Sequence, residues 1–349
     1  MKKRLVLVDG FSILHRAYHA YPISIATSRG EIVNAVYGFV RILLKIIDDL
    51  KPSYLAVAFD LPVPTFRHKE YIGYQVQRPK MDAELEGQIK RTRQVLEAFK
   101  MPLFAKEGFE ADDVIGTLAF QARSLKLKTK NSKLKTKKKK IKKEGIEVVI
   151  VTGDRDMLQL VRAGVKLYLP KRTFGEAELY DEKKTKEFLG ILPKQIVDYK
   201  ALIGDASDNY PGVAGIGPKT AVSLLRQFGT LEKVYRKLGV KLDGRKATLR
   251  TQKRAKRTEI SLKIKDKLVA GVESVRLSQK LAKIVENVPI KLKIDDCRLH
   301  DYDKGKAREL FEELEFKSLL DKLPGMKKEA RSTKHEVRST NESEQMKLV

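Results

Sequence analysis

The sequence contains very little cysteine, and this limits the kinds of site that it can build. Its 349 residues include one cysteine, Cys297, so no disulfide can form within the chain and a cysteine-based zinc site is not expected. No segment approaches the roughly 18 uninterrupted apolar residues that a membrane-spanning helix needs. The first apolar run, Leu5–Val8, ends at Asp9 and is too short for a signal peptide. We therefore expect a chain that folds in a reducing cytoplasm and does not enter a membrane.

Histidine is also scarce and scattered. The five histidines are His15, His19, His68, His300 and His335. Only the first two have a helical spacing, and we interpret them as surface or core residues rather than as a metal-binding pair.

Acidic residues are outnumbered by basic ones. The chain has 72 lysines and arginines against 45 aspartates and glutamates, which gives a formal net charge of +27. Such an excess of positive charge indicates the kind of binding partner rather than the fold. The commonest partner of a strongly basic protein is a polyanion such as nucleic acid. A merely basic, soluble surface is the alternative. Clustering of the basic residues favours the polyanion.

Lysine is most concentrated between residues 124 and 143, where 11 lysines and no acids occur. Blocks of like charge repel themselves and stay disordered. Because a short connection would suffice here, we interpret the block as an insertion that raises non-specific affinity for DNA; drift in a tolerant loop is the alternative. A second basic stretch at 245–265 is either another insertion or a long charged helix, and the polar residues from 324 onward are expected to be flexible.

Short apolar runs alternate with helical patterns in the first half of the chain. The runs Leu5–Val8, Tyr54–Phe59 and Val148–Val151 have the length of buried strands, and residues 34–50 and 85–99 have helical periodicity. This alternation predicts an α/β fold with a mostly parallel sheet and helices on both faces. From about Leu192 onward the strands fade, which predicts a second, helical region.

Each of the three predicted strands leads into acidic residues. Asp9 and Asp60 follow the first two strands, and Asp154 and Asp156 follow the third. Because the carboxyl ends of parallel strands meet at one edge of a sheet, where open α/β proteins build their sites, we expect these carboxylates to lie close together.

Two further acidic groups complete the set. Glu110, Asp112 and Asp113 open a predicted helix, where helix capping is an equally good explanation for them taken alone. Asp205 and Asp208 are three residues apart. Nine close carboxylates cannot all stay ionised unless cations neutralise them. An all-oxygen ligand set favours magnesium or manganese, and two such ions can clamp the attacking and leaving oxygens of a phosphodiester displacement.

A glycine-rich loop follows the last acids. The segment GVAGIGPKTA is not a phosphate-binding P-loop, because Pro218 separates Gly217 from Lys219 and no apolar strand precedes it. A helix-hairpin-helix fits better, since Gly215 and Gly217 allow a tight turn and Pro218 suits the first position of a helix. Backbone N–H groups of such a hairpin can hold DNA phosphates without recognising bases. A plain helical turn in the core is the alternative.

Aromatic and basic residues are interleaved between Pro64 and Met81. In this stretch Phe66, Tyr71 and Tyr74 alternate with arginines and lysines. Basic groups can meet backbone charge while aromatic rings stack on exposed bases. A solvated loop is an equally good interpretation of this stretch.

Seven ordered motifs resemble one family. They are LVDGFSILHRAYHA, NAVYGF, PTFRH, FEADDVIGTLA, VTGDRDMLQL, GDASDNYPGVAGIGPKTA and LFEELEFKSLL. Together they resemble the 5′-nuclease domain of bacterial DNA polymerase I and, more broadly, the flap endonuclease superfamily. The resemblance runs in order from Lys3 to about Leu323.

The resemblance implies a PIN-like nuclease core over residues 1–190, with a helical arch at about 64–100 that admits a single-stranded 5′ end. It implies a helix-hairpin-helix region over 191–323, and leaves a flexible tail at 324–349.

It also implies two divalent ions. Their first ligand group is Asp9, Asp60, Glu110, Asp112 and Asp113, and their second is Asp154, Asp156, Asp205 and Asp208. In or near the arch, the implied catalytic residues are Tyr74, Arg78 and Lys80. The implied duplex contacts are Gly215, Ile216, Gly217, Lys219 and Thr220, in the family often with a bound potassium ion.

The implied activity is that of a 5′→3′ exonuclease and 5′-flap endonuclease in Okazaki fragment processing and DNA repair. The partners would be DNA with 5′ ends or flaps, RNA–DNA hybrids and a separate polymerase chain, because no polymerase portion is recognisable in the sequence. We expect a monomer in the cytoplasm, associated with the nucleoid. A catalytically silent DNA-binding scaffold and an RNA-directed nuclease of the PIN type are the alternatives.

Overall fold

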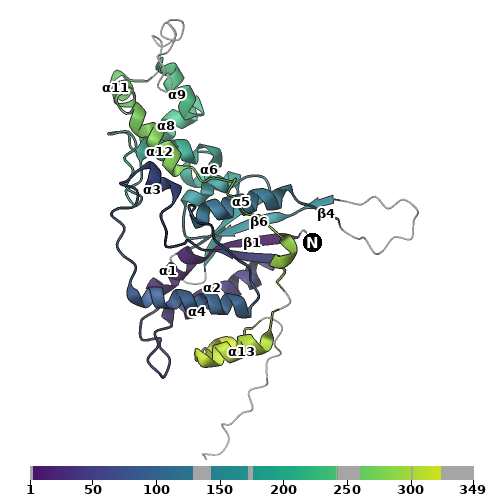
Figure 1. Cartoon of the computed structure of the whole chain (residues 1–349). Helices are drawn as coiled ribbons and strands as arrows, with labels where there is room; N and C mark the ends of the chain where they lie inside the picture. The colour runs from purple at the N-terminus through teal and green to yellow at the C-terminus, as the bar shows by residue number, and fades with distance from the viewer. Residues whose placement is uncertain are drawn as a thin grey trace, which may run out of the picture.

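The computed structural model describes residues 3–128, 143–171, 176–240, 242, 260–299 and 302–323. Most of the lysine-rich block, the basic stretch up to residue 259 and the tail from 324 lie outside the described residues. The two ends of the lysine-rich block are described, and they are not disordered as we expected. Lys126–Lys128 (β4) and Lys143–Gly145 (β5) pair as antiparallel strands that project from the sheet (Figure 1).

A six-stranded sheet forms the centre of the molecule, in the order β3-β2-β1-β6-β7-β8. Its strands are β1 (Arg4–Asp9), β2 (Tyr54–Ala58), β3 (Leu103–Phe104), β6 (Glu147–Val151), β7 (Val165–Pro170) and β8 (Ala177–Tyr180). All neighbours are parallel except β7 and β8, so the prediction of a mostly parallel sheet is confirmed. Asp9 pairs with Ala58, and Val8 pairs with Val151, so the three central strands end level with one another.

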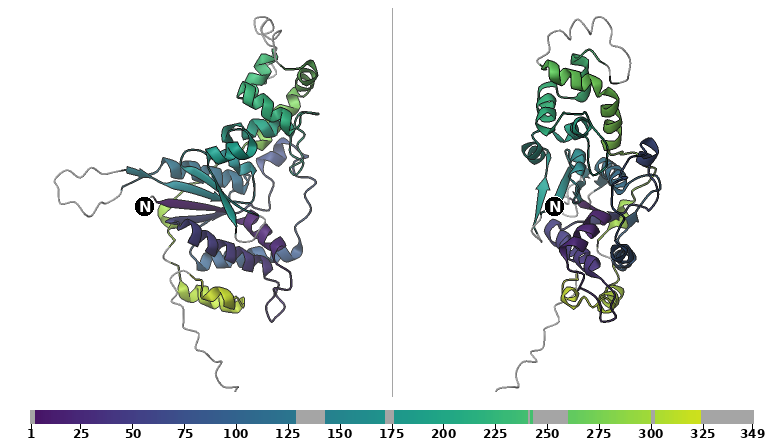
Figure 2. Two further views of the ribbon diagram at one scale, coloured as in Figure 1. Left: turned by 180° about the vertical axis from the view of Figure 1, so that it is seen from behind. Right: turned by 90° about the vertical axis from the view of Figure 1, so that its left-hand side faces the viewer.

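The sheet is buried on both faces, which explains why its strands are continuous apolar runs. Leu5 and Leu7 face one core, together with α5 (Ala111–Ser124). Val6 and Val8 face the other core, together with α1 (Gly10–Ala20), α2 (Asn34–Leu50) and α4 (Ala83–Ala98). Figure 2 shows these two layers on opposite sides of the strands.

The second half of the described chain is mostly helical. Its elements up to residue 297 are α6 (Glu182–Leu189), α7 (Ile196–Ile203), α8 (Pro218–Phe228), α9 (Leu231–Lys237), α11 (Leu262–Ala270) and α12 (Val272–Ala282), with 3-10 turns η1 (Asp156–Leu160), η2 (Pro193–Gln195) and η3 (Ile294–Cys297). Their buried side chains continue the core on the α5 face of the sheet. Among the described helices, none is both long and apolar enough to cross a membrane.

The last described helices return to the opposite face of the sheet. α13 (Lys304–Glu313) and α14 (Lys317–Leu320) share the core of α1, α2 and α4, where the rings of Phe311 and Phe99 lie 5.9 Å apart. The predicted boundary at residue 190 remains a prediction, but the end of the predicted second region packs on the first.

The region predicted as a helical arch contains two helices. α3 (Phe66–Glu70) is short, and α4 begins at Ala83, with non-helical chain between them. In Figure 1 this connection runs along the outside of the molecule from the helical region to α4.

Candidate active site at the carboxyl edge of the sheet

A cleft opens where the central strands end. It contains about 1810 Å³ of empty space, part of which is open to solvent. Six of the nine predicted carboxylates line it: Asp9, Asp60, Glu110, Asp112, Asp154 and Asp208. Thus the strand ends and the start of α5 meet at one edge, as the parallel sheet requires.

Asp9 is held in place at the junction of β1 and α1. One carboxylate oxygen accepts a hydrogen bond from the Ser12 N–H (3.0 Å) and caps α1, and the other accepts one from the Thr152 hydroxyl (2.7 Å). Burial raises the pKa of Asp9 to about 7 in spite of these bonds, and the neighbouring Asp60 and Asp154 raise it further. A cation in the cleft would relieve this cost.

Asp60 and Asp112 face the same space from β2 and α5. Asp60 accepts a hydrogen bond from the Ala111 N–H (2.8 Å), and desolvation raises its pKa. Burial, followed by repulsion from Asp154 and Asp9, raises the pKa of Asp112 well above its usual range. Within the part of the chain that the structure describes, no hydrogen bond or ion pair engages the Asp112 carboxylate. It is therefore available to a cation.

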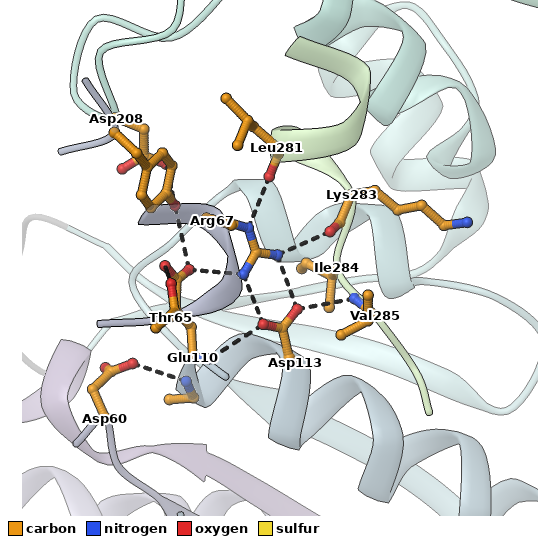
Figure 3. Close-up of polar contacts among 12 residues, drawn as sticks. Asp60, Thr65, Arg67, Glu110, Asp113, Asp208, Leu281, Lys283, Ile284 and Val285 are labelled. Carbon is orange, nitrogen blue, oxygen red and sulfur yellow. Dashed lines mark hydrogen bonds and ion pairs between the residues drawn. The ribbon is translucent and has the colours of Figure 1, made fainter. Parts of the chain in front are cut away.

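Asp113, the next residue, is not available, and this corrects its predicted role as a metal ligand. Its side chain is completely buried and accepts two hydrogen bonds from the Arg67 guanidinium, at 2.7 and 2.9 Å. It also accepts from the N–H groups of Glu110 (3.2 Å) and Val285 (2.9 Å). Figure 3 shows these four bonds converging on one carboxylate. Successive positions on a helix point in different directions, so Asp112 faces the cleft while Asp113 faces the core.

Arg67 joins three parts of the structure behind the cleft. Besides Asp113, it donates to Glu110 (3.1 Å) and to the carbonyl oxygens of Leu281 and Lys283 (both 2.9 Å) (Figure 3). It thereby fixes α3 to α5 and to the end of α12. The sequence analysis missed this role, because it grouped Arg67 with exposed basic residues. Burial alone would lower the pKa of Arg67, but Asp113 and Glu110 raise it overall, so the guanidinium stays charged.

Lys200 on α7 neutralises two of the remaining acids. Its ammonium lies 2.7 Å from an Asp156 oxygen and 2.5 Å from an Asp205 oxygen. Burial would raise the pKa of Asp205, but Lys200 and Ser207 lower it overall. Burial and Asp154 raise the pKa of Asp156 to about 7. The sequence analysis missed Lys200 too, although it is the only basic residue between Lys194 and Lys219.

Asp208 connects the acidic cleft to the chain between α3 and α4. Its carboxylate accepts hydrogen bonds from Arg78 (2.7 Å) and the Gln75 amide (3.1 Å), and its carbonyl accepts from the Gln75 N–H (3.0 Å). Arg78 therefore lines the cleft, and its predicted catalytic role remains a prediction.

The other two residues predicted in the arch lie elsewhere. The Tyr74 side chain is 3% exposed, and its hydroxyl donates to Glu110 (3.3 Å) and Asp208 (3.4 Å). A ring buried in this way cannot stack on a base, so Tyr74 supports the acids from behind. Lys80 is exposed and does not line the cleft.

Basic side chains also line the cleft, and they were not singled out from the sequence. They are Lys90 and Arg93 on α4 and Arg78, which is paired with Asp208. His68 on α3 lines the cleft too, but burial lowers its pKa and favours the neutral ring. A polyanion that enters the cleft would thus meet basic side chains as well as carboxylates.

The hairpin before α8 has the predicted turn. Gly215 has a φ of +74°, and the Lys267 ammonium donates to its carbonyl oxygen at 2.9 Å. Pro218 begins α8, as predicted. Gly215, Gly217 and Lys219 are exposed, and Thr220 is partly so. Ile216 was predicted to contact DNA, but its side chain is 4% exposed and packs in the core. It anchors the turn and cannot offer a side-chain contact to a ligand.

The donor set of the cleft fits hard divalent cations, although the carboxylates do not converge on one point. In the described residues, no three carboxylate, imidazole or thiol groups lie close enough together to hold one ion. Instead, cationic side chains stand between them: Lys200 between Asp156 and Asp205, and Arg78 beside Asp208. The other cleft carboxylates would need a bound cation to stay ionised. Their oxygen atoms are ligands that magnesium and manganese prefer.

The raised pKa values predict how the stability of the metal-free protein depends on pH. Burial raises the pKa of Asp9, Glu110 and Asp156 to about 7, against about 4 in an unfolded chain. Between about pH 4 and about pH 7 the folded state thus binds more protons than the unfolded state. The free energy of unfolding should therefore fall as pH rises from about 4 to about 7. Thermal melting in EDTA should show this fall, and added magnesium should reverse most of it. A melting temperature that rises over this range in EDTA would contradict the prediction.

The chain matches two family profiles. The profile described as "5'-3' exonuclease, N-terminal resolvase-like domain" matches residues 4–131, and that described as "5'-3' exonuclease, C-terminal SAM fold" matches residues 191–305. The chain is 39% identical to DNA polymerase I of Bacillus caldotenax over 324 residues, which cover 93% of this chain and 32% of that protein. It is 34% identical to DNA polymerase I of Bacillus subtilis over 322 residues, which cover 92% of this chain and 32% of that protein. The chain spans about a third of the length of these relatives.

Solved structures share the fold at low sequence identity. Phage T5 5′-exonuclease with bound zinc has a TM-score of 0.57 at 20% identity, covering 80% of this chain and 89% of that chain. A complex of the T5 flap endonuclease with DNA and metal ions has a TM-score of 0.59 at 17% identity, covering 90% and 100%. The catalytic core of Rad2 with a DNA substrate has a TM-score of 0.53 at 18% identity, covering 90% and 89%.

Proposed function

The chain belongs to the 5′-3′ exonuclease family of metal-dependent nucleases, and on this basis we propose that it hydrolyses phosphodiester bonds at the 5′ ends and 5′ flaps of DNA. The observation that carries this proposal is the cleft at the strand ends. It combines six of the nine predicted carboxylates with basic side chains from α4 and from the chain between α3 and α4. Such a cleft can accept a phosphate backbone and bring it to divalent ions.

The carboxylates of the cleft would hold two magnesium ions, with manganese as a substitute. When bound, such ions supply an activated water and stabilise the leaving oxygen of a phosphodiester. Asp9, Asp60, Asp112 and Asp154 would contribute ligands that line the cleft. Arg67 and Tyr74 would hold Glu110 in position, and Lys200 would do the same for Asp156 and Asp205. Cleavage would leave a 5′-phosphate and a 3′-hydroxyl.

The single strand would enter along the basic side chains of the cleft. Lys90 and Arg93 line it from α4, and Arg78 lines it beside Asp208. Their charges can pair with successive phosphates of an unpaired strand without recognising bases. We assign Lys80 to the approach path outside the cleft, since its side chain is exposed.

The duplex would be held at the hairpin by the exposed groups of Gly215, Gly217, Lys219 and Thr220. A potassium ion at this turn is also proposed. The connection between Asp208 and Gly215 is rigid: Asp205 and Tyr210 exchange backbone hydrogen bonds (2.9 and 3.0 Å), and the Gly212 N–H donates to Ser278 (3.1 Å). A side chain at position 212 would collide with the backbone of Gly204, so only glycine allows this approach. The rigid connection would set the distance from the held duplex to the acids, and so which phosphate is cut.

Replacing Lys219 by alanine should weaken the binding of duplex DNA to a similar extent for every base sequence. The exposed Lys219 lines a shallow depression together with Ser223 and Arg226 on α8. Loss of one phosphate contact should lower the slope of log affinity against log salt by about 0.9. The measurement is a salt series of fluorescence anisotropy with labelled duplex DNA. Lys306→Ala on α13, at the far end of the molecule in Figure 1, is the matched control. Equal slopes for both variants would exclude Lys219 from the interface.

The polarity of cleavage tests the proposal. Duplexes with a 5′ flap, a 3′ flap or neither should be incubated with the protein and magnesium, and the products mapped to single nucleotides. We expect cuts near the junction of the 5′ flap and no cuts in the 3′ flap. Equal cutting of both flaps would contradict the proposal, and preferential cutting of an RNA flap over a DNA flap would point to an RNA-directed nuclease.

The wider role of the chain follows from its relatives. We propose that it removes RNA-primed or displaced 5′ strands during Okazaki fragment processing and repair, and that it acts on RNA–DNA hybrids as well as on DNA. We further propose that it works as a monomer in the cytoplasm at the nucleoid, beside a DNA polymerase.

A further inference from the structure

Two histidines project side by side from α1, outside the acidic cleft. His15 and His19 are both exposed, and their Nε2 atoms lie 3.2 Å apart. Their ring centroids are 4.4 Å apart, with the ring planes at 71°. Ile13, Leu14 and Ala17 bury the opposite face of α1, so the helix that carries the pair is fixed to the core.

The distance between the two nitrogens matches a chelate. Two imidazole nitrogens at 2.0–2.1 Å from one tetrahedral zinc ion are about 3.3 Å apart. In the metal-free protein the same spacing lets one ring N–H donate to the other ring nitrogen. A metal ion could replace that proton with little movement of either ring, if both rings carried their proton on Nδ1.

Aromatic rings and charged side chains surround the pair. Phe11 lies 6.0 Å from His15 and Tyr18 lies 5.2 Å from His19, measured between ring centroids. The nearby charged groups that act on His15 are Asp82 and Arg78. Among the described residues no third ligand completes the site, so water would fill the remaining positions.

We propose that His15 and His19 together bind one transition-metal ion, such as zinc, nickel or copper. Imidazole nitrogen suits these metals, whereas magnesium prefers an all-oxygen site such as the cleft. The proposal departs from our interpretation of the two histidines as surface or core residues rather than a metal-binding pair. Because Arg78 lines the cleft, an ion on the pair would add positive charge near the cleft mouth.

Calorimetric titration of the full chain with zinc tests the proposal. Zinc can also bind to the cleft carboxylates, so each variant is compared with the wild type at the same magnesium concentration. We expect a zinc-binding step whose affinity is reduced in both His15→Gln and His19→Gln. Loss of outer-shell partners alone costs roughly 10- to 100-fold in metal affinity, so loss of a ligand should cost at least about tenfold. Lys306→Ala on α13, which changes an exposed residue far from the pair, should bind zinc as the wild type does.

Proton NMR of the wild-type histidine rings gives a second measurement that needs no variant. Zinc should shift the resonances of His15 and His19. Unchanged isotherms in both pair variants, or zinc shifts confined to other histidines, would overturn the proposal.

Discussion

Asp112→Asn should abolish flap cleavage while the protein stays folded. The Asp112 carboxylate faces the cleft without a partner in the described structure, beside Asp9 and Asp154. Asparagine keeps its shape but removes the charge that would hold a cation. Removing a residue that only supports a metal ligand lowers metal affinity or activity roughly 10- to 100-fold. Because Asp112 would be a ligand itself, we expect the single-turnover rate to fall at least about 100-fold. The rate should be measured on a labelled 5′-flap duplex with magnesium.

The same variant should be more stable than the wild type when no metal is present. Burial and neighbouring carboxylates raise the pKa of Asp112 in the folded protein, which means that its charge destabilises the fold at neutral pH. Removing the charge should therefore raise the melting temperature in EDTA at pH 7. If Asp112→Asn melted well below the wild type, the carboxylate would have a structural role that the structure does not show.

Asp113→Asn should have the opposite signature, with a large loss of stability. Asp113 and Arg67 form a buried, bidentate ion pair, and removal of the Asp113 charge leaves the buried Arg67 with Glu110 as its remaining acidic partner. Breaking such a pair costs about 3–5 kcal/mol of unfolding free energy. Urea unfolding at neutral pH should show this loss for Asp113→Asn, and a similar one for Arg67→Met, which keeps much of the length of the side chain.

The adjacent residues serve as controls for each other. Both changes replace an aspartate by asparagine in the first turn of α5, so a difference between them reflects the partners of each carboxylate and not the helix. If Asp113→Asn kept wild-type stability and lost only cleavage, then Asp113 would be a ligand after all, and the account of Arg67 would be wrong.

Much of the fold was predictable because it depends on local patterns. The buried runs at Leu5–Val8 and Val148–Val151 have the composition of central parallel strands, and a parallel sheet brings their ends to one edge. The convergence of Asp9, Asp60 and Asp154 on the cleft follows from that topology alone. The turn at Gly215 and the helix start at Pro218 were likewise set by local backbone preferences.

Which acids face the cleft and which are paired inside the protein was not predictable, because this depends on contacts between distant segments. Asp113 is removed from the cleft by Arg67, 46 residues away in the sequence, and by the N–H of Val285, 172 residues away. Tyr74 and Ile216 resemble surface residues of a binding loop until packing places them inside. Periodicity identifies which face of a helix is apolar, but not which polar group on another element will meet it.

The central claim is that the acidic cleft uses divalent ions to cut DNA at 5′ flaps. The most direct measurement is a single-turnover reaction of the wild-type chain with a 5′-flap duplex, run in parallel with magnesium and with EDTA. We predict cleavage products that end in a 5′-phosphate with magnesium, and intact but still bound flap with EDTA. Binding without cleavage in magnesium and in manganese would contradict the claim and identify the chain as a DNA-binding scaffold.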